Sequence, residues 1–354
     1  MSEPLVVSSH KGPYEVVFDE DALELLARQA PAKARFIVDA NVAALHAGSL
    51  EAVLPQALVI EATEKNKSLD RMPDYVAALL ERGTRRGDVL TAIGGGIIQD
   101  ITCFLAATLF RGLPWHFYPT TLLAQADSCI GSKSSINVGR FKNIMGTFTP
   151  PDRVFVTTQV LKTLDRREML SGVGEMLKVH AIDGPQSFDA LAARYHDLLE
   201  DAALLRDTVR RSLLIKQRFI EEDEFDKGVR NIMNYGHSFG HAIESATEFG
   251  MPHGIAVSMG MDMANWVAVG MGVSTPPHFA RMHPVLAENF SEFRNLPIPV
   301  EPFLAALAKD KKNTEDRLRL ILPGQDGRLF VGLHANDQTF RSLCATYLEK
   351  VRQE

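Results

Sequence analysis

Residues 230–253 read RNIMNYGHSFGHAIESATEFGMPH, and three histidines in this stretch are spaced as metal ligands are. If the stretch is helical, His237 and His241 lie four residues apart on one face, separated by about one turn of 5.4 Å. Gly250–Pro252 then ends the helix, because proline cannot continue it, and the turn can bring His253 back toward the pair. A catalytic zinc site uses three protein ligands and one open position, and a carboxylate would fit as the remaining ligand.

Two glycines in this stretch favour a functional interpretation over an ordinary helix. Gly236 and Gly240 stand at interior helix positions, where each costs about 0.8–1 kcal/mol relative to alanine. They predict the close approach of another backbone or of a ligand, with Asn234 on the same side as the histidines. The plainer alternative, a histidine pair on a surface or in a core, stays open at this point.

Composition sets limits on the class of protein. The chain has 354 residues, 45% of them apolar, which is enough to bury a sizeable core and suggests two domains. The net charge is −6 and there is no block of lysine or arginine, so nothing favours nucleic acid as a partner. No apolar run approaches the roughly 18 residues that span a bilayer, and no signal sequence is evident. Three cysteines far apart predict reduced thiols and a cytoplasmic protein.

The first half alternates short apolar strands with helical patterns, which is typical of a βαβ fold with a parallel sheet. Residues 35–39, 57–61 and 88–93 read as buried strands. After the third, Gly94–Asp100 (GGGIIQD) opens a helix that runs to Arg111. A glycine turn there allows backbone N–H groups and the positive helix end to face a pyrophosphate. The motif is weak by itself, because triple glycine also occurs in plain turns.

Hydroxyls and lysines follow the next strand, residues 115–118. Thr120 and Thr121 stand at its carboxyl end, where ligands bind in open α/β sheets. Lys133 and the pair Lys142–Asn143 follow Asp127 along the chain. They suggest an anion pocket, and a charge-balanced surface loop is the alternative.

The second half has helical periodicity, and we place a domain boundary near residue 157. Glu175 and Lys178 lie one turn apart, a spacing shared with ordinary surface ion pairs, but their apolar neighbours and two glycines argue against a surface position. Residues 317–322 and 328–331, separated by PGQDG, predict a hairpin within this helical domain.

Taken together, these motifs closely resemble the 3-dehydroquinate synthase family of sugar phosphate cyclases. The matching blocks are NYGHSFGHAIE followed by PHG, SGVGEMLK, GGGIIQD, PTTLLAQADS, GSK, KNIMGTF and EKNKS, and the resemblance runs from about residue 35 to about residue 335. It implies an α/β dinucleotide-binding domain with a mostly parallel sheet at residues 1–157. A mainly α-helical metal- and substrate-binding domain would follow at 158–354.

The resemblance also implies roles for individual residues. Glu175, His237 and His253 would hold a divalent metal, zinc or cobalt. NAD would be bound by Asp39, Glu64, Lys67, Gly95, Gly96, Asp100, Thr120, Thr121, Lys133, Lys142 and Thr163. The substrate would meet Asp127, Lys133, Asn143, Lys178, Lys216, Arg230, Asn234, His241 and one lysine of the pair Lys311–Lys312, for which we take Lys311. Arg111 would reach the phosphate site of the neighbouring subunit in a homodimer.

The implied activity is a cyclisation with catalytic NAD. In the family, an alcohol of a cyclic sugar phosphate is oxidised, phosphate is eliminated, the ketone is reduced again and the opened product closes by aldol addition. The expected substrate is 3-deoxy-D-arabino-heptulosonate 7-phosphate, in the shikimate pathway. The chain departs from the family at Gln99, Ser132, Ser134–Ser135 and Val138–Gly139, which keeps sister cyclases of sedoheptulose 7-phosphate or glucose 6-phosphate open. A metal- and NAD-dependent polyol dehydrogenase and a non-catalytic relative are further alternatives.

Overall fold

The central sheet of the first half is parallel except at one edge. In this computed structural model, which describes residues 3–28, 30–309 and 317–354, its seven strands have the order β1-β2-β9-β6-β5-β3-β4, and only β1 is antiparallel. The strands are β1 (Leu5–Val7), β2 (Tyr14–Phe18), β3 (Ala34–Asp39), β4 (Leu58–Ile60), β5 (Val89–Gly94), β6 (Trp115–Pro119) and β9 (Arg153–Val156). The predicted strands and the parallel sheet are confirmed.

The inner strands are apolar on both faces because both faces are covered. Phe36 and Ile37 on β3, Ile93 on β5 and Phe117 on β6 are at most 1% exposed. Such near-continuous apolar runs are typical of parallel strands. The accompanying helices are α1 (Ala22–Arg28), α2 (Ala40–Leu45), α3 (Met72–Glu81) and α4 (Gly96–Thr108), and α4 packs against β5, β6 and β3.

The strand order creates a crevice at the ends of β3 and β5. From β3 the chain moves outward to β4 and then returns to the other side of β3 as β5. Ligands of open α/β sheets bind outside the carboxyl ends of the strands at such a reversal. Asp39 ends β3, and Gly95 follows β5 as the residue before α4. The topology therefore places these two predicted NAD residues beside the same crevice.

A two-stranded hairpin completes the site-bearing part of the first unit. β7 (Lys133–Val138) pairs antiparallel with β8 (Phe141–Phe148), and β7 packs against α4. The chain divides into two compact units, the first formed by Met1–Asp165 and Val209–Asp226. Most of α7 (Ala202–Glu222) thus belongs to the first unit. The sequence did not indicate that the chain returns to the first unit after the second has begun. The boundary at residue 157 stays a prediction about the functional domains.

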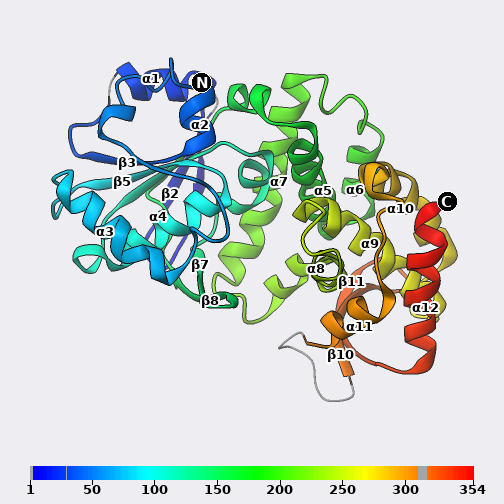
Figure 1. Cartoon of the computed structure of the whole chain (residues 1–354). Helices are drawn as coiled ribbons and strands as arrows, with labels where there is room; N and C mark the ends of the chain where they lie inside the picture. Colours follow the sequence, from blue (N-terminus) through cyan, green and yellow to red (C-terminus); the bar gives the residue numbers. More distant parts are fainter. Residues whose placement is uncertain (1–2, 29, 310–316) are drawn as a thin grey trace. The chain divides into compact units, whose positions relative to one another are not determined.

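The second unit, Arg166–Thr208 and Lys227–Glu354, is mainly helical. Its helices are α5 (Arg166–Asp183), α6 (Pro185–Ala192), α8 (His237–Ala246), α9 (His253–Gly270), α10 (Pro276–Asn289), α11 (Val300–Ala308) and α12 (Gln338–Glu349) (Figure 1). The predicted hairpin is confirmed as β10 (Arg317–Pro323) and β11 (Leu329–Ala335), with Gly327 at a φ of 75° in the turn. Lys311 and Lys312 lie outside the described residues.

Glycines bring α5, α8 and α9 into backbone contact. A Cβ atom added at Gly254 on α9 would lie 1.8 Å from the carbonyl oxygen of Ser171 on α5. A Cβ added at Gly240 on α8 would lie 3.1 Å from the carbonyl oxygen of Ala256 on α9. The predicted close approach at Gly240 is thus confirmed, and the approaching group is the backbone of α9.

The stretch 230–253 is not one helix, contrary to the interpretation from sequence. Val229–Asn234 forms a short 3₁₀ helix, and Tyr235 and Gly236 leave helical geometry, with Gly236 at a φ of 78°. α8 begins only at His237. Asn234 therefore does not continue the helical face of His237 and His241, and helical spacing does not relate Arg230 to them. The predicted return of His253 after Pro252 is confirmed, because His253 begins α9.

Candidate active site

Three imidazoles and one carboxylate converge in the second unit. His237 and His241 come from the first turns of α8, His253 from the start of α9, and their ligand nitrogens lie within 4.8 Å of one another. Glu175 on α5 directs Oε1 to within 3.7 Å of His237 Nε2 and 3.4 Å of His253 Nε2. The structure thus brings together the three predicted metal ligands, and His241, which the resemblance assigns to the substrate, lies in the same cluster.

Two further side chains orient this cluster. Lys178 Nζ lies 2.5 Å from Glu175 Oε2, and both residues are buried, so this is not the surface ion pair that the spacing alone allowed. The other carboxylate oxygen therefore faces the imidazoles. Glu244 on α8 lies 3.2 Å from His253 Nδ1 through its Oε1. A carboxylate on the second nitrogen of a ligand histidine fixes the ring and its tautomer.

The electrostatics of the cluster attract positive charge to His253 and leave His237 neutral. Burial and the nearby Lys178 ammonium hold the pKa of His237 well below 6.5, so its ring is in the form that binds metals. Burial opposes protonation of His253 as well, but Glu175 and Glu244 raise its pKa to about 10. A buried carboxylate that faces imidazole nitrogens matches the donor set of a zinc-type site, and His253 would release its proton when a metal binds. The residues present therefore fit a divalent metal.

A second cluster in the first unit joins four of the predicted NAD- and substrate-side residues. Lys67 Nζ lies 3.2 Å from Asp100 Oδ2, 3.0 Å from Asn143 Oδ1 and 3.4 Å from Glu64 Oε1. Lys67 is buried although it is charged, which is rare for lysine unless it is paired. Burial raises the pKa of the Asp100 carboxyl, and the Lys67 ammonium opposes that rise. Burial acts likewise on Glu64, but Asn137, Lys67 and Lys142 lower its pKa overall.

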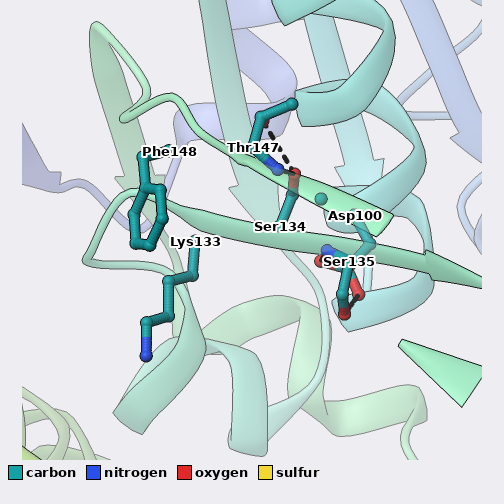
Figure 2. A pocket seen from close by; sticks show the side chains of 7 residues that line it. Asp100, Lys133, Ser134, Ser135, Thr147 and Phe148 are labelled. Carbon is teal, nitrogen blue, oxygen red and sulfur yellow. Dashed lines mark hydrogen bonds between the residues drawn. The ribbon is translucent and has the colours of Figure 1, made fainter. Parts of the chain in front are cut away.

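A pocket of about 310 Å³ opens beside this cluster, between α4 and the β7–β8 hairpin (Figure 2). It is lined by Asp100, Lys133, Ser134, Ser135, Gly146, Thr147 and Phe148. Asp100 Oδ1 accepts a hydrogen bond from the backbone N–H of Ser135 at 3.0 Å, and Ser134 Oγ lies 2.9 Å from Thr147 Oγ1. The predicted residues Asp100 and Lys133 thus share one concave site, close to the helix that the glycine motif opens.

Two lysines of the first unit hold carboxylates. Lys216 on α7 lies 2.5 Å from Asp127 Oδ1 and donates to the main-chain oxygen of Asp127 at 2.6 Å. Lys133 Nζ lies 2.5 Å from Asp226 Oδ2. The sequence predicted an anion pocket formed by Lys133, Lys142 and Asp127. In the structure, Asp127 instead forms an ion pair with Lys216 of α7.

The remaining predicted residues have separate local roles. Asp39 caps α2 through a hydrogen bond to Asn41 N–H, Thr163 Oγ1 lies 2.9 Å from His46 Nε2, and Thr121 Oγ1 accepts from Ala124 N–H. Thr120 is buried, Gly95 and Gly96 begin α4, and Lys142 is exposed. Asn234 donates to Asn231 O, Arg230 is buried, and Arg111 is exposed with a φ of 69°.

Several participating residues were not identified from sequence. Glu244 follows His241 by three residues and His237 by seven, so helical spacing could have placed it on their face. Asn137 donates to Glu64 and accepts from Asn143 N–H. Gln99 and Ser128 exchange two hydrogen bonds of 2.7 Å, a contact between distant segments that no spacing reveals.

Comparison with known proteins identifies the family. Residues 57–171 match the family described as 3-dehydroquinate synthase N-terminal, and residues 172–313 match 3-dehydroquinate synthase C-terminal. The 3-dehydroquinate synthase of Streptococcus thermophilus is 32% identical over 347 residues, covering 92% of this chain and 95% of the relative. This chain belongs to the 3-dehydroquinate synthase family.

Further relatives agree with that membership. The 3-dehydroquinate synthase of Xanthomonas oryzae pv. oryzae is 36% identical over 306 residues, which is 82% of each chain. The solved structure of 2-epi-5-epi-valiolone synthase from Streptomyces hygroscopicus, with NAD+ and Zn2+ bound, is 26% identical and covers 95% of this chain and 97% of that one, with a TM-score of 0.83. The predicted fold, a parallel-sheet unit with a mainly helical unit, is confirmed. Among the described residues, every helix is too short or too polar to cross a bilayer.

Proposed function

We propose that this chain is a 3-dehydroquinate synthase-type cyclase that converts 3-deoxy-D-arabino-heptulosonate 7-phosphate to 3-dehydroquinate with release of phosphate. The observation that carries the proposal is the convergence of Glu175, His237, His241 and His253 beside a buried lysine, Lys178. The identity to curated 3-dehydroquinate synthases over most of the chain supports it.

The second unit would hold the metal and part of the substrate. Glu175, His237 and His253 would be the metal ligands, since Glu244 and Lys178 already orient this set. His241 is exposed while His237 and His253 are partly buried, which favours a role toward the substrate for His241. A bound divalent metal would supply polarisation of the carbinol and ketone oxygen. Lys178, Arg230 and Asn234 would bind the anionic and hydroxyl groups of the sugar phosphate.

The first unit would hold NAD, whose nicotinamide would supply reversible hydride acceptance. Gly95 and Gly96 offer the N-terminus of α4 to the pyrophosphate, at the carboxyl edge of the parallel sheet. Lys67 and Asp100 fix one another beside the pocket, with Asp39, Glu64, Thr120, Thr121, Lys142 and Thr163 as further contacts. Asp127, Lys133, Asn143 and Lys216 would serve the substrate.

Phosphate release without net NADH distinguishes this activity from its alternatives. The metal-loaded protein with NAD is given heptulosonate phosphate, sedoheptulose 7-phosphate and glucose 6-phosphate in separate assays. We expect stoichiometric phosphate from the first and no accumulation of NADH at 340 nm. Accumulating NADH would indicate a polyol dehydrogenase, and phosphate release from one of the other two sugars would indicate a sister cyclase.

We further propose a cytoplasmic homodimer. In it, Arg111 would contact the phosphate of the neighbouring subunit. Its exposed side chain and the left-handed backbone at Phe110 and Arg111, with φ of 53° and 69°, support a functional position, because such geometry is costly for non-glycine residues. A fully active monomer in analytical ultracentrifugation would contradict this proposal.

A further inference from the structure

A second cavity, of about 180 Å³, lies in the mainly helical unit and shares no residue with the metal cluster or with the pocket at Asp100. It is formed by α5, the segment after α6, and the end of α10. Its wall includes Leu170, Val173, Tyr195, Arg166, Glu200 and Glu288. The volume equals that of roughly six liquid waters, enough for one small organic molecule.

Two apolar side chains and a tyrosine form the floor of this cavity, and the tyrosine is held in place. Leu170 and Val173 on α5 are buried, and Tyr195 is partly buried beside them. The Tyr195 hydroxyl donates to Asn289 Oδ1 at 3.0 Å. Asn289 is itself buried, and its amide donates to Leu170 O at 3.2 Å and to Ser258 Oγ at 2.8 Å. Because these bonds fix the tyrosine in advance, a ligand would not have to order this wall.

The rim carries charges of both signs. Glu200 and Glu288 contribute exposed carboxylates, and Arg166, at the first residue of α5, contributes a guanidinium. Glu288 and Arg166 act on the same phenol: burial raises the pKa of Tyr195, Glu288 raises it further, and Arg166 lowers it. The pair that Arg166 makes with Glu292 is long, at 4.0 Å, and exposed, so it contributes little and leaves the guanidinium able to take another carboxylate.

We propose that this cavity binds the zwitterion of a small neutral amino acid. Its ammonium would lie toward Glu288 and Glu200, its carboxylate toward Arg166, and its apolar side chain over Leu170 and Val173. A molecule with an ammonium, a carboxylate and a short apolar side chain would pair with the rim charges of both signs and also cover the apolar residues of the floor. A simple amine or a simple carboxylate satisfies only part of this set.

The hydrogen bonds at the floor also lead toward the metal cluster. Ser258 Oγ, which accepts from Asn289, donates to Gly254 O at 3.0 Å, and Gly254 follows His253 in the sequence. The backbone N–H of Gly254 in turn donates to Ser171 Oγ at 2.9 Å. A ligand on Tyr195 would therefore touch the same bonded network that fixes the start of α9.

Calorimetric titration of the full-length, metal-loaded protein tests the site. The probes are L-alanine, L-leucine and L-phenylalanine, with 3-methylbutylamine and 4-methylpentanoate as leucine analogues that lack the carboxylate or the ammonium. We expect at least one amino acid to bind with one site per chain, and Arg166→Gln and Glu288→Gln each to weaken it at least tenfold, as the loss of a charge-assisted hydrogen bond does. Glu349→Gln, an exposed change on α12 outside the cavity, should leave binding unchanged.

Three results would overturn the proposal. The first is the absence of heat for all three amino acids. The second is unchanged affinity in both cavity variants, which would place any binding elsewhere. The third is equal affinity for leucine and for 3-methylbutylamine, which would show that Arg166 takes no part. Both rim residues that vary in the test, Arg166 and Glu288, are exposed, so equal unfolding midpoints of the variants serve as the check on folding.

Discussion

The ammonium group of Lys216 lies 2.5 Å from the Asp127 carboxylate and 2.6 Å from the main-chain oxygen of the same residue. Both residues are buried, and they join α7 to the π-helical turn Ala124–Ser128. Removing one partner of a buried pair leaves an uncompensated charge. Lys216→Met should therefore reduce the free energy of unfolding by about 3–5 kcal/mol, measured by urea denaturation.

The double variant Asp127→Asn/Lys216→Met is the matched control for this pair. It removes both charges together, so it should recover part of the stability that Lys216→Met loses. A single variant as stable as the wild type would show that the pair makes no net contribution.

Close packing of α5 against α9 should make Gly254 intolerant of any side chain. A Cβ at this position would lie 1.8 Å from Ser171 O, which is backbone and cannot rotate away. Overpacking of this kind costs about 1–3 kcal/mol, occasionally more, so Gly254→Ala should lower the melting temperature and the metal content together. Gly48→Ala is the control, because nothing lies within 4 Å of an added Cβ there. Equal melting temperatures for the two variants would contradict the packing argument.

The Glu244–His253 contact predicts the effect of a change outside the ligand set. Glu244 Oε1 lies 3.2 Å from His253 Nδ1. Loss of such an orienting carboxylate typically weakens metal binding about 10–100-fold. Glu244→Gln should show this loss in a zinc competition titration against a chelator, whereas Glu248→Gln, an exposed change four residues later, should not.

The same titration tests the division of roles among the histidines. If His241 serves the substrate, His241→Ala should keep metal content near one per chain, whereas His237→Ala should lose it. Equal losses in the two variants would mean that all three imidazoles are ligands.

A histidine remote from the metal cluster predicts a pH dependence of stability. His283 Nδ1 lies 3.0 Å from both carboxylate oxygens of Asp262. That hydrogen bond raises the pKa of His283 above 6.5, although burial and Arg294 oppose it. The folded state thus holds this proton more tightly than the unfolded state does. Its stabilising contribution is complete below pH 6.5 and is lost as the pH rises through the higher pKa of the folded state.

Urea unfolding at a series of pH values measures this contribution. The stability difference between the wild type and His283→Gln should shrink as the pH rises above 6.5. A difference that stays constant or grows with pH would mean that His283 is neutral in the folded protein.

Local sequence patterns predicted the helices and strands, but they did not predict which distant residues contact one another. The apolar runs at 35–39 and 88–93 predicted strands correctly, because burial on both faces of a parallel sheet leaves a continuous signal. The helix around His237 was predicted too long, since Gly236 adopts a left-handed backbone that the 3.6-residue period does not reveal. The return of His253 was predictable because proline is disfavoured inside a helix, although α8 already ends at Ala246 and Pro252 is the residue before α9.

Pairings between distant segments could not be read from the sequence. Lys216 was named by family resemblance, but its partner Asp127 lies 89 residues away in the chain. Asp226, the partner of Lys133, gave no signal at all, because its position depends on the return of α7 to the first unit. Such contacts follow from tertiary packing, and local spacing carries no information about them.

Arg230 bears on the choice of substrate. It is buried rather than on the surface, in the 3₁₀ helix that packs against α5, the helix of Glu175. A buried arginine in a cationic site suits a carboxylate bound through both of its oxygens. Such a pair contributes about 1.5–3 kcal/mol of binding free energy. This corresponds to about 10–150-fold selectivity for a carboxylated sugar over its neutral analogue. Five residues between Ser132 and Gly139 depart from the family, lie in β7 or directly next to it, and argue for a different sugar.

We therefore predict that the heptulosonate phosphate is turned over and that sedoheptulose 7-phosphate is not. Arg230→Ala should lower kcat/KM for the heptulosonate at least tenfold, because the substrate carboxylate loses the two hydrogen bonds that the planar guanidinium donates. Arg230→Lys should recover only part of this loss, since lysine keeps the charge without the fork. Steady-state phosphate release measures all three proteins, with unfolding midpoints as the check on folding. If sedoheptulose 7-phosphate proves the better substrate of the wild type, Arg230 does not bind a substrate carboxylate, and the altered hairpin around Ser134 and Ser135 sets the specificity.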